Sequence, residues 1–331
     1  MRKSSIKKID KISPPVSVII TIVNEEKYLA RAVDAVLNSD YKGKIEILLA
    51  VGPSRDKSRE IADELALRDK RIRVFENPTG KTPNGLNIAL KRSRHQIIVR
   101  IDGHSEIEPS YISTAVQILG ETGAVNVGGI MDAQGLTDFQ RAVASAMRSK
   151  IGVGAARFHT GGWAGPADTV YLGVFKKSAL EAVGGYNENF IRAQDWELNH
   201  RLRLNGGLIW FDPSLKVRYR PRSSIMALGR QYFEYGRWRR ALSKHHRGTI
   251  NFRYLAPPLN FLLTLLSISA GFLLSKLFFI PLFSYLTLII LSSQFIGKNW
   301  RERLLLPTVL LTMHYAWGFG FITSPRKLLP S

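Results

Sequence analysis

The sequence has no cysteine among its 331 residues. Disulfide bonds, thiolate nucleophiles and cysteine-based zinc sites are therefore excluded. The basic N-terminal tail, residues 1–15, has no apolar core behind its charges, so it does not match a secretory signal. We expect the domain that follows it to stay in the cytoplasm.

Acidic residues are scarce: Asp and Glu number 26 against 47 Lys and Arg, a formal net charge of +21. Such an excess favours a polyanionic partner, which could be nucleic acid, an anionic bilayer or phosphorylated substrates. Charge alone does not choose among these partners. The hydrophobic content of 45% is that of a folded protein and not of a disordered one.

Charged residues are also absent from three apolar stretches near the C-terminus, residues 255–275, 277–297 and 304–324. A membrane-spanning helix needs roughly 20 apolar residues, so about three transmembrane helices are predicted. The first two stretches are separated by little more than Lys276. A re-entrant hairpin is therefore an alternative to two full spans.

Basic residues predict the orientation of these helices, because they gather on the cytoplasmic side. Seven precede the first stretch and three separate the second from the third: Arg230, Arg237, Arg239, Arg240, Lys244, Arg247 and Arg253, then Lys298, Arg301 and Arg303. Both segments are expected in the cytoplasm, with Lys276 outside. A third span would then place Arg326 and Lys327 of the 325–331 tail outside, against the rule.

The region 223–254 combines arginines with aromatic rings, among them Tyr232, Phe233, Tyr235 and Trp238. Its segment 224–248 is expected to be helical. It reads as an amphipathic helix at the membrane interface, with rings and cations at the headgroups. The alternative is a helix that packs on the soluble domain.

Residues 16–222 alternate between strand-like and helix-like segments. The expected strands are 16–22, 45–51, 71–75 and 96–101, and the expected helices are 25–38, 57–67, 83–93 and 199–204. This alternation predicts an α/β domain with a mostly parallel sheet. Ligands of such sheets bind beyond the carboxyl ends of the strands, here residues 23–25, 52–56 and 102–104.

Three motifs carry candidate chemistry. Asp102 and His104, one residue apart on a loop, can bind a divalent cation that bridges a diphosphate, or can form a simple Asx turn. Lys81, in the glycine- and proline-rich loop 78–87, can bind phosphate at a helix start, or the loop can be a turn and cap. Asp195 beside Trp196 can be a general base, a helix N-cap, or both.

In this order and spacing, the segments resemble the inverting family-2 glycosyltransferases, which have the GT-A nucleotide-sugar fold. The resemblance covers roughly residues 15–210 and the membrane region. It is carried by Asn24-Glu25-Glu26, by residues 100–104, by Val183-Gly184-Gly185-Tyr186 and by residues 194–198. The likeness is greatest to bacterial succinoglycan-type exopolysaccharide transferases, which also share the segment 314–321.

The resemblance implies a role for each matched residue. Asp195 would be the catalytic base, and Asp102 with His104 would hold Mg²⁺ or Mn²⁺. The donor, expected to be a UDP-sugar, would contact Asn24, Glu25, Val51, Lys81, Asn87, Arg100 and Asp102. The acceptor, a lipid-linked saccharide or polyprenyl diphosphate, would contact Gln194, Trp196, Glu197, Gln231, Arg237 and Trp238. The implied partners are an anionic membrane and other envelope-glycan enzymes, but no nucleic acid.

Two departures from the family pattern stand out. Val51 or Gly52 replaces the aspartate that usually binds the nucleoside, while Asp56 suits a turn or helix cap. Gln231 and Arg237-Trp238 are farther apart than in processive synthases, which favours single sugar additions. The missing aspartate keeps open a catalytically silent scaffold or sugar-nucleotide sensor; a transporter and a nucleic-acid-binding protein are weaker alternatives.

Overall fold

The computed structural model describes residues 13–325 and residue 328. Most of the expected N-terminal tail, and Arg326 and Lys327, lie outside the described residues.

The first half of the catalytic domain alternates between strands and helices, as the sequence predicts. The elements are β1 (Val16–Ile22), α1 (Leu29–Leu37), β2 (Ile45–Val51), α2 (Ser58–Arg68), β3 (Ile72–Glu76), α3 (Thr82–Arg92) and β4 (Ile97–Asp102). Strands β3, β2, β1 and β4 pair in parallel in that order. Their carboxyl ends therefore share one edge of the sheet.

The second half adds antiparallel pairing that the sequence did not reveal. Its strands are β5 (Glu106–Ile107), β6 (Asn126–Ala133), β7 (Gly165–Pro166), β8 (Tyr171–Lys176) and β9 (Ile209–Tyr219). Its helices are α4 (Tyr111–Thr122), α5 (Asp138–Met147), α6 (Lys150–Val153), α7 (Arg157–Thr160), α8 (Lys177–Ala182) and α9 (Gln194–Leu204). The described strands form one sheet of order β3-β2-β1-β4-β8-β6-β9-β5, and β7 pairs with β9.

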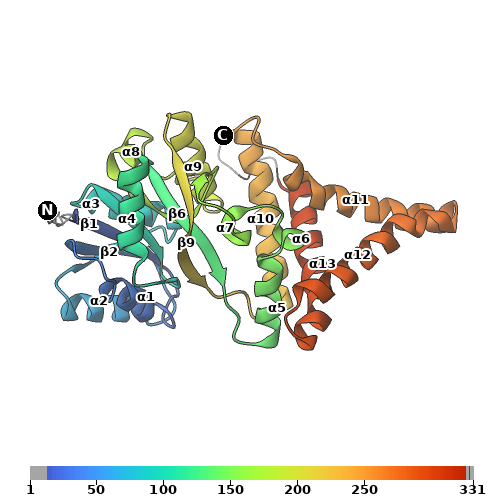
Figure 1. The fold of residues 1–331 in the computed structure, drawn as a ribbon, viewed down its shortest axis with the longest axis horizontal. Coiled ribbons are helices and arrows are strands. Elements are labelled where there is room, and N and C mark those ends of the chain that lie inside the picture. The colour runs from blue at the N-terminus through green and yellow to red at the C-terminus, as the bar shows by residue number, and fades with distance from the viewer. Residues whose placement is uncertain (1–12, 326–327, 329–331) are drawn as a thin grey trace, which may run out of the picture.

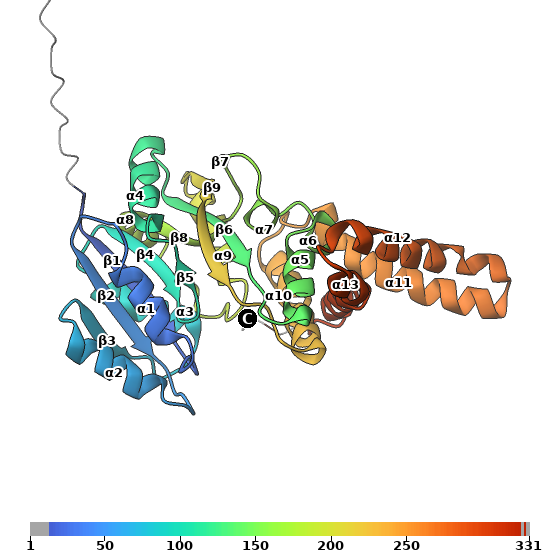
Figure 2. The ribbon, with the colours of Figure 1, turned by 60° about the horizontal axis from the view of Figure 1, so that its bottom comes forward.

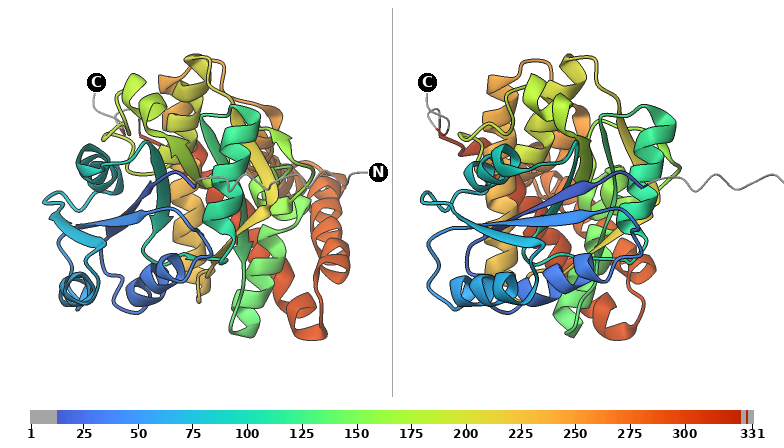
Figure 3. Two further views of the ribbon diagram at one scale, coloured as in Figure 1. Left: turned by 60° about the vertical axis from the view of Figure 1, so that its left-hand side comes forward. Right: turned by 90° about the vertical axis from the view of Figure 1, so that its left-hand side faces the viewer.

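Helices cover both faces of this sheet (Figure 3). The two-residue period of β4 sorts its side chains between the two layers. Val99 and Ile101 join the core that includes α1, α2 and α4. Ile98 joins the opposite core, with residues of α3, α8 and α9. Arg100 and Asp102, in step with Ile98, therefore point toward α9.

Three C-terminal helical segments are long and apolar enough to cross a membrane: Phe252–Leu273, Lys276–Ile296 and Trp300–Ile322. They comprise α11 (Phe252–Leu273), the short 3-10 helix η1 (Lys276–Phe279), α12 (Ile280–Ile296) and α13 (Trp300–Ile322). Helices α11 and α12 form a hairpin that projects from the rest of the molecule (Figures 1 and 2). Helix α13 instead runs beside α10 (Ile225–His245).

Both ends of α13 are bonded to the catalytic side of the molecule. At its start, Arg301 pairs with Asp138 of α5 at 3.2 Å. The adjacent Glu302 accepts a 2.9 Å hydrogen bond from Ser145, which is also in α5. At its end, Arg240 of α10 donates to the carbonyl of Phe321 at 3.0 Å. Leu328 then packs against a cluster that includes Trp238. Whether α13 also crosses a membrane, as the sequence predicts, stays a prediction.

Helices α10 and α13 touch backbone to backbone. A Cβ atom on Gly236 would overlap the carbonyl oxygen of Trp317, and one on Gly320 would overlap that of Phe233. Tyr232 and Trp238 of α10 are buried. Helix α10 is thus packed on its neighbours, as the alternative interpretation of its sequence has it. Its location at a membrane interface stays a prediction.

We expect Gly236→Ala and Gly320→Ala each to lower the unfolding free energy by about 1–3 kcal/mol, because the added methyl group forces the two helices apart. Thermal unfolding of the purified full-length protein measures this change. Gly120→Ala on α4 is the matched control, since nothing lies within 4 Å of a Cβ there. The control should keep or raise the unfolding midpoint, and an equal loss in all three variants would contradict the close crossing.

Candidate active site

The loops after β1 and β2 are locked together at the edge where the parallel strands end. The backbone N–H of Asn24 donates to Ser54 Oγ at 3.1 Å, and Asn24 Oδ1 accepts from the N–H of Arg55 at 2.8 Å. Asn24 has a left-handed backbone, with φ of 56°. Asp56 accepts from the N–H of Ser58 at 3.1 Å, which confirms the turn predicted for it. These polar side chains hold the rim of the site rigid.

Glu25 and His104 form the next layer of the site. Glu25 Oε1 lies 2.8 Å from His104 Nδ1. Gly103 allows this approach, because a Cβ atom there would lie 2.9 Å from Glu25 Cγ. Burial alone would lower the pKa of His104, but the hydrogen bond that the ring donates to Glu25 and the charge of Asp102 outweigh it and raise that pKa. Engagement of Nδ1 leaves Nε2 as the ring nitrogen available to a ligand.

Arg100 joins the two carboxylates that the sequence singled out. Its side chain is 2% exposed. Its Nη2 lies 3.0 Å from Asp102 Oδ1, and its Nη1 pairs with Asp195 Oδ1. The ring of Tyr186 lies beneath the guanidinium, 5.9 Å from Cζ. Although burial opposes the charged form, the negative charge of Asp102 raises the pKa of Arg100, so the guanidinium stays a cation.

Helix α9 presents Asp195 to this guanidinium. The helix begins at Gln194, and its N-cap is Ala193, whose φ of 58° is left-handed. The expected helix start at residue 199 was therefore five residues late (199 − 194), and the N-cap alternative for Asp195 was wrong. Asp195 lies in the first turn, where a carboxylate is favoured by the helix dipole. Both Asp102 and Asp195 keep one carboxylate oxygen outside the pair with Arg100.

The remaining candidate donor residues differ in their exposure and in their contacts. Lys81 is the exposed N-cap residue of α3. Asn87 clamps the backbone of Tyr186, donating to its carbonyl and accepting from its N–H, each at 2.8 Å. Val51 is 2% exposed in the hydrophobic core, and its carbonyl accepts from the N–H of Asn77. The structure thus gives Asn87 a positioning role and keeps the Val51 side chain away from the rim.

Among the acceptor candidates on α9, Gln194 and Trp196 are partly exposed, whereas Glu197 is 1% exposed. The Glu197 carboxylate makes two 2.7 Å hydrogen bonds with Arg201 and lies 3.2 Å from His246 Nε2. This carboxylate is therefore committed to ion pairs inside the fold, which fix α9 against the segment after α10.

The acceptor candidates on α10 contact two different parts of the molecule. Gln231 Nε2 donates to the hydroxyl of Tyr219, whose ring centroid is 6.4 Å from that of His104. Gln231 is thus connected to the carboxyl edge of the sheet. Arg237 pairs with Glu234 at 2.8 Å, and Trp238 is buried against Phe190. Trp238 supports the start of α9, because Ala193 and Trp196 pack against its cluster.

Sequence reasoning missed the position of Arg239. This side chain is 6% exposed and lies between two rings, with Cζ 4.2 Å from the Trp196 centroid and 3.5 Å from the Tyr254 centroid. Burial lowers the pKa of Arg239 to about 10. The sequence counted it among cations facing the membrane surface, because charge patterns do not show which arginine turns inward.

Asp102 and His104 suit a divalent metal, since Mg²⁺ and Mn²⁺ take carboxylate oxygen and imidazole nitrogen ligands. Across residues 13–325 and 328, no group of three or more His, Asp or Glu side chains could hold a metal alone. A metal here would therefore complete its shell with phosphate oxygens of a donor or with water.

We expect Arg100→Gln to lower the unfolding free energy by about 3–5 kcal/mol, because it leaves two carboxylates side by side without their shared cation. Chemical or thermal unfolding measures the loss. The matched control is Arg59→Gln, which removes an exposed pair with Asp63 at 2.8 Å and should cost at most about 1 kcal/mol. Similar losses in both variants would show that the buried pairs are not as described.

Comparison with known proteins agrees with this geometry. A family model described as Glycosyl transferase family 2 matches residues 17–184. The succinoglycan biosynthesis protein ExoA of Rhizobium meliloti is 31% identical over 242 residues, which are 72% of this chain and 73% of that protein. A Methanococcus voltae protein named dolichyl N-acetyl-alpha-D-glucosaminyl phosphate 3-beta-D-2,3-diacetamido-2,3-dideoxy-beta-D-glucuronosyltransferase is 26% identical over 92% of this chain and 95% of its own.

Among solved structures, the mannosyltransferase PcManGT from Pyrobaculum calidifontis, in complex with GDP-Man and Mn²⁺, superposes with a TM-score of 0.60. It is 18% identical, and the match covers 93% of this chain and 89% of that one. The fold is thus the GT-A fold expected from the sequence. This chain belongs to glycosyltransferase family 2.

Proposed function

We propose that this glycosyltransferase moves a sugar from a nucleotide-sugar to a lipid-linked saccharide, inverting the anomeric configuration. The observation that carries the proposal is the pairing of Asp102 and Asp195 with the single guanidinium of Arg100. That pairing brings a donor-side and an acceptor-side carboxylate into one site. A silent scaffold would have no use for two acids held so close together.

In the proposed reaction, Asp195 accepts the proton of an acceptor hydroxyl through the oxygen that Arg100 leaves unused. The acceptor oxygen then bonds to the anomeric carbon as the bond from that carbon to the nucleotide diphosphate breaks on the opposite face. Arg100 holds Asp195 in place throughout, and Trp196 and Gln194 flank the entry of the acceptor. Asp102 and the Nε2 atom of His104 would hold Mg²⁺ or Mn²⁺, which offsets the charge of the departing diphosphate.

Donor recognition rests on the rim formed by Asn24, Glu25 and Lys81. Because Val51 lies in the core, the nucleoside would be recognised by this rim and by backbone groups. PcManGT was solved with GDP-Man, and Staphylococcus aureus TarS, with a TM-score of 0.51, was solved with UDP. We keep a UDP-sugar as the first donor to test.

The lipid-linked acceptor is supported by two relatives. The Methanococcus voltae enzyme is named for a dolichyl-linked acceptor, and its match includes the membrane helices of this chain. ExoA is named for succinoglycan biosynthesis, which points to a role in exopolysaccharide or envelope-glycan assembly. We also propose single sugar additions, and contact with other envelope-glycan enzymes, as the sequence analysis suggests.

We further propose that the catalytic domain faces the cytoplasm and that only the hairpin of α11 and α12 enters the bilayer. Helix α13 would then lie along the membrane surface beside α10. The ties of α13 to Asp138 and Arg240 support this arrangement. It also removes the conflict with the positive-inside rule, because the chain after α13 returns to the cytoplasmic side.

We expect Asp195→Asn to lower the rate of sugar transfer by about 10²–10⁴-fold while nucleotide-sugar binding is retained, because the base is lost but the donor site is not. A screen of nucleotide-sugars by thermal shift with Mn²⁺ identifies the donor, and its transfer or hydrolysis gives the rate. Asp63→Asn on the exposed face of α2 is the control and should keep the full rate. Equal, measurable rates in Asp195→Asn and the native enzyme would count against catalysis through Asp195, and absence of transfer by the native protein with every donor would favour the silent scaffold.

Single cysteines test the membrane arrangement cleanly, since the native chain has none. Thr323→Cys after α13 and Lys42→Cys on the catalytic domain both introduce an exposed thiol. We expect an impermeant maleimide to label neither in intact cells and both after permeabilisation. Labelling of Thr323→Cys alone in intact cells would show that α13 crosses the membrane, and labelling of both would place the catalytic domain outside.

A further inference from the structure

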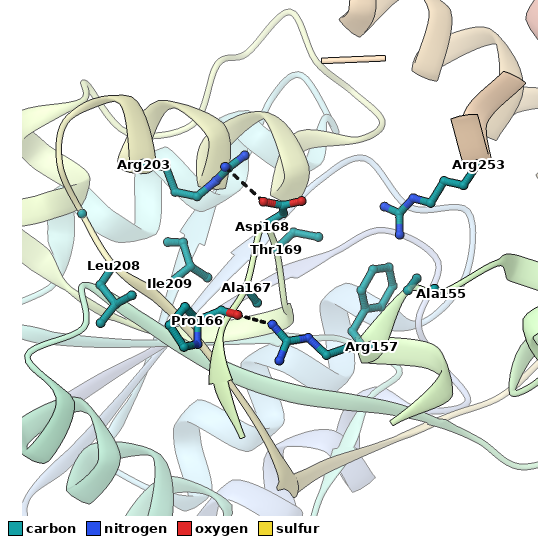
Figure 4. A pocket seen from close by; sticks show the side chains of 13 residues that line it. Ala155, Arg157, Pro166, Ala167, Asp168, Thr169, Arg203, Leu208, Ile209 and Arg253 are labelled. Carbon is teal, nitrogen blue, oxygen red and sulfur yellow. Dashed lines mark hydrogen bonds and ion pairs between the residues drawn. The ribbon is translucent and has the colours of Figure 1, made fainter. Parts of the chain in front are cut away.

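A cavity of about 400 Å³ lies on the α9 side of the sheet, between the catalytic domain and the first membrane helix. None of the residues assigned above to donor, metal or acceptor lines it. Three arginines enter it from three different elements: Arg157 from α7, Arg203 from the end of α9 and Arg253 from the start of α11 (Figure 4). Its volume is within the range of small-molecule sites. We call it the arginine cavity.

The arginine cavity has more positive than negative charge. Asp168 is the acidic residue among those lining it, and it pairs with Arg203 at 3.1 Å. Arg157 donates to the carbonyl oxygens of Pro166 and, at 3.3 Å, of Trp163, so neutral groups hold it in place. Arg253 contacts the ring of Tyr254, with Cζ 4.5 Å from the centroid. Two of the three guanidinium charges therefore lack a carboxylate among the lining residues.

The same cavity stands next to the membrane module. Arg253 is the second residue of α11, the first helix that can enter a bilayer. The segment before α7 is bonded to α13, through His314 Nε2 and the carbonyl of Ile151 at 2.8 Å. A phosphate group on a lipid in the surrounding leaflet could thus reach these arginines without leaving the membrane surface.

The cavity is also connected to the catalytic helix. Asp195, Asn199 and Arg203 are spaced four residues apart on α9, which places them along one side of the helix. Asn199 donates to Thr169 of the cavity lining at 2.9 Å. From Asp195 to Arg203 the helix rises about 12 Å. Asn199 is 1% exposed, so this side of α9 links the two sites through the protein interior and is not an open path between them.

Arg239 is a buried cation that lies between the two sites. It lies against Trp196 on the catalytic side and Tyr254 on the cavity side, and Arg253 is close enough to lower its pKa in addition to the larger effect of burial. Burial, with a smaller contribution from Arg253, also lowers the pKa of His159 to about 3. Because burial is the larger cause of both shifts, the preference for an anion rests on the excess of guanidinium groups in the cavity lining and not on these pKa values.

We propose that the arginine cavity binds a phosphate or diphosphate group carried by a lipid, and that in catalysis this group is the carrier end of the acceptor. Only the second part of this proposal, that the bound group is the carrier end of the acceptor, rests on the proposed function. Arginine suits this role because its planar guanidinium donates paired hydrogen bonds to phosphate oxygens. Selection of the acceptor would then depend on the lipid phosphate as well as on the sugar that receives the new bond.

The test measures binding of farnesyl diphosphate to the full-length protein in phosphatidylcholine nanodiscs, without any sugar transfer. We expect Arg157→Gln/Arg253→Gln to weaken this binding at least ten-fold. The matched control is Arg31→Gln/Arg68→Gln, which removes the same charge from exposed positions on α1 and α2 and should leave the affinity unchanged. Nucleotide-sugar binding by each variant reports whether the fold is intact, and Arg253→Gln alone replaces the double variant if that one unfolds.

Equal affinity of the native protein and the folded arginine variant would overturn the proposal. Inorganic pyrophosphate that binds as tightly as farnesyl diphosphate would overturn the requirement for a lipid. Short-chain phosphatidylglycerol that competes equally well would assign the cavity to phospholipid headgroups and overturn its assignment to the acceptor. Asp195→Asn should bind farnesyl diphosphate as the native protein does. The binding test therefore remains interpretable even if Asp195 is not the catalytic base.

Discussion

The site depends on one buried cation. Two carboxylates held close together repel each other, and a guanidinium inside a core is costly without partners. Arg100 resolves both problems, since it lies between Asp102 and Asp195 with Tyr186 beneath it. Each carboxylate keeps one oxygen outside this pair. In the proposed reaction, the separation of donor and acceptor chemistry would thus be set by the width of one side chain.

Several parts of the fold hold that cation in place. The alternation of β4 turns Arg100 and Asp102 toward the same helix layer, and Gly185 lets the chain approach α3 closely enough for Asn87 to clamp the backbone of Tyr186. Glu197 anchors α9 from inside through Arg201. These contacts join residues that are far apart in the sequence.

The sequence predicted the first half of the domain well, because β1 to β4 are short, mostly β-branched or apolar segments that alternate with helical segments. It did not predict the antiparallel pairing of β8 with β4 and β6, which no local pattern records. Motif positions located Asp102, His104 and Asp195, but the contact between Asp195 and Arg100 joins separate motifs. The Val51 side chain lies in the core at a position aligned with a nucleoside contact, and its predicted place in the donor site stays a prediction.

Hydropathy predicted the length of α13, but it did not predict that α13 packs against α10. An apolar surface that faces lipid and one that faces another helix have the same composition, so only the close approach at Gly236 and Gly320 distinguishes them. A third crossing would place basic residues on the wrong side of the membrane, and the proposed surface location of α13 would remove that conflict.

The stack of Trp196, Arg239 and Tyr254 joins the catalytic helix to the first membrane helix through a single side chain. Leu328, beyond the last helix, packs on the cluster of Phe190, Trp238 and Leu242, against which Trp196 also packs. The catalytic domain therefore has no clean boundary at which it could be excised. A truncated, water-soluble version would expose Trp196 and strip the wall behind Asp195, so the anchor is also part of the enzyme's architecture.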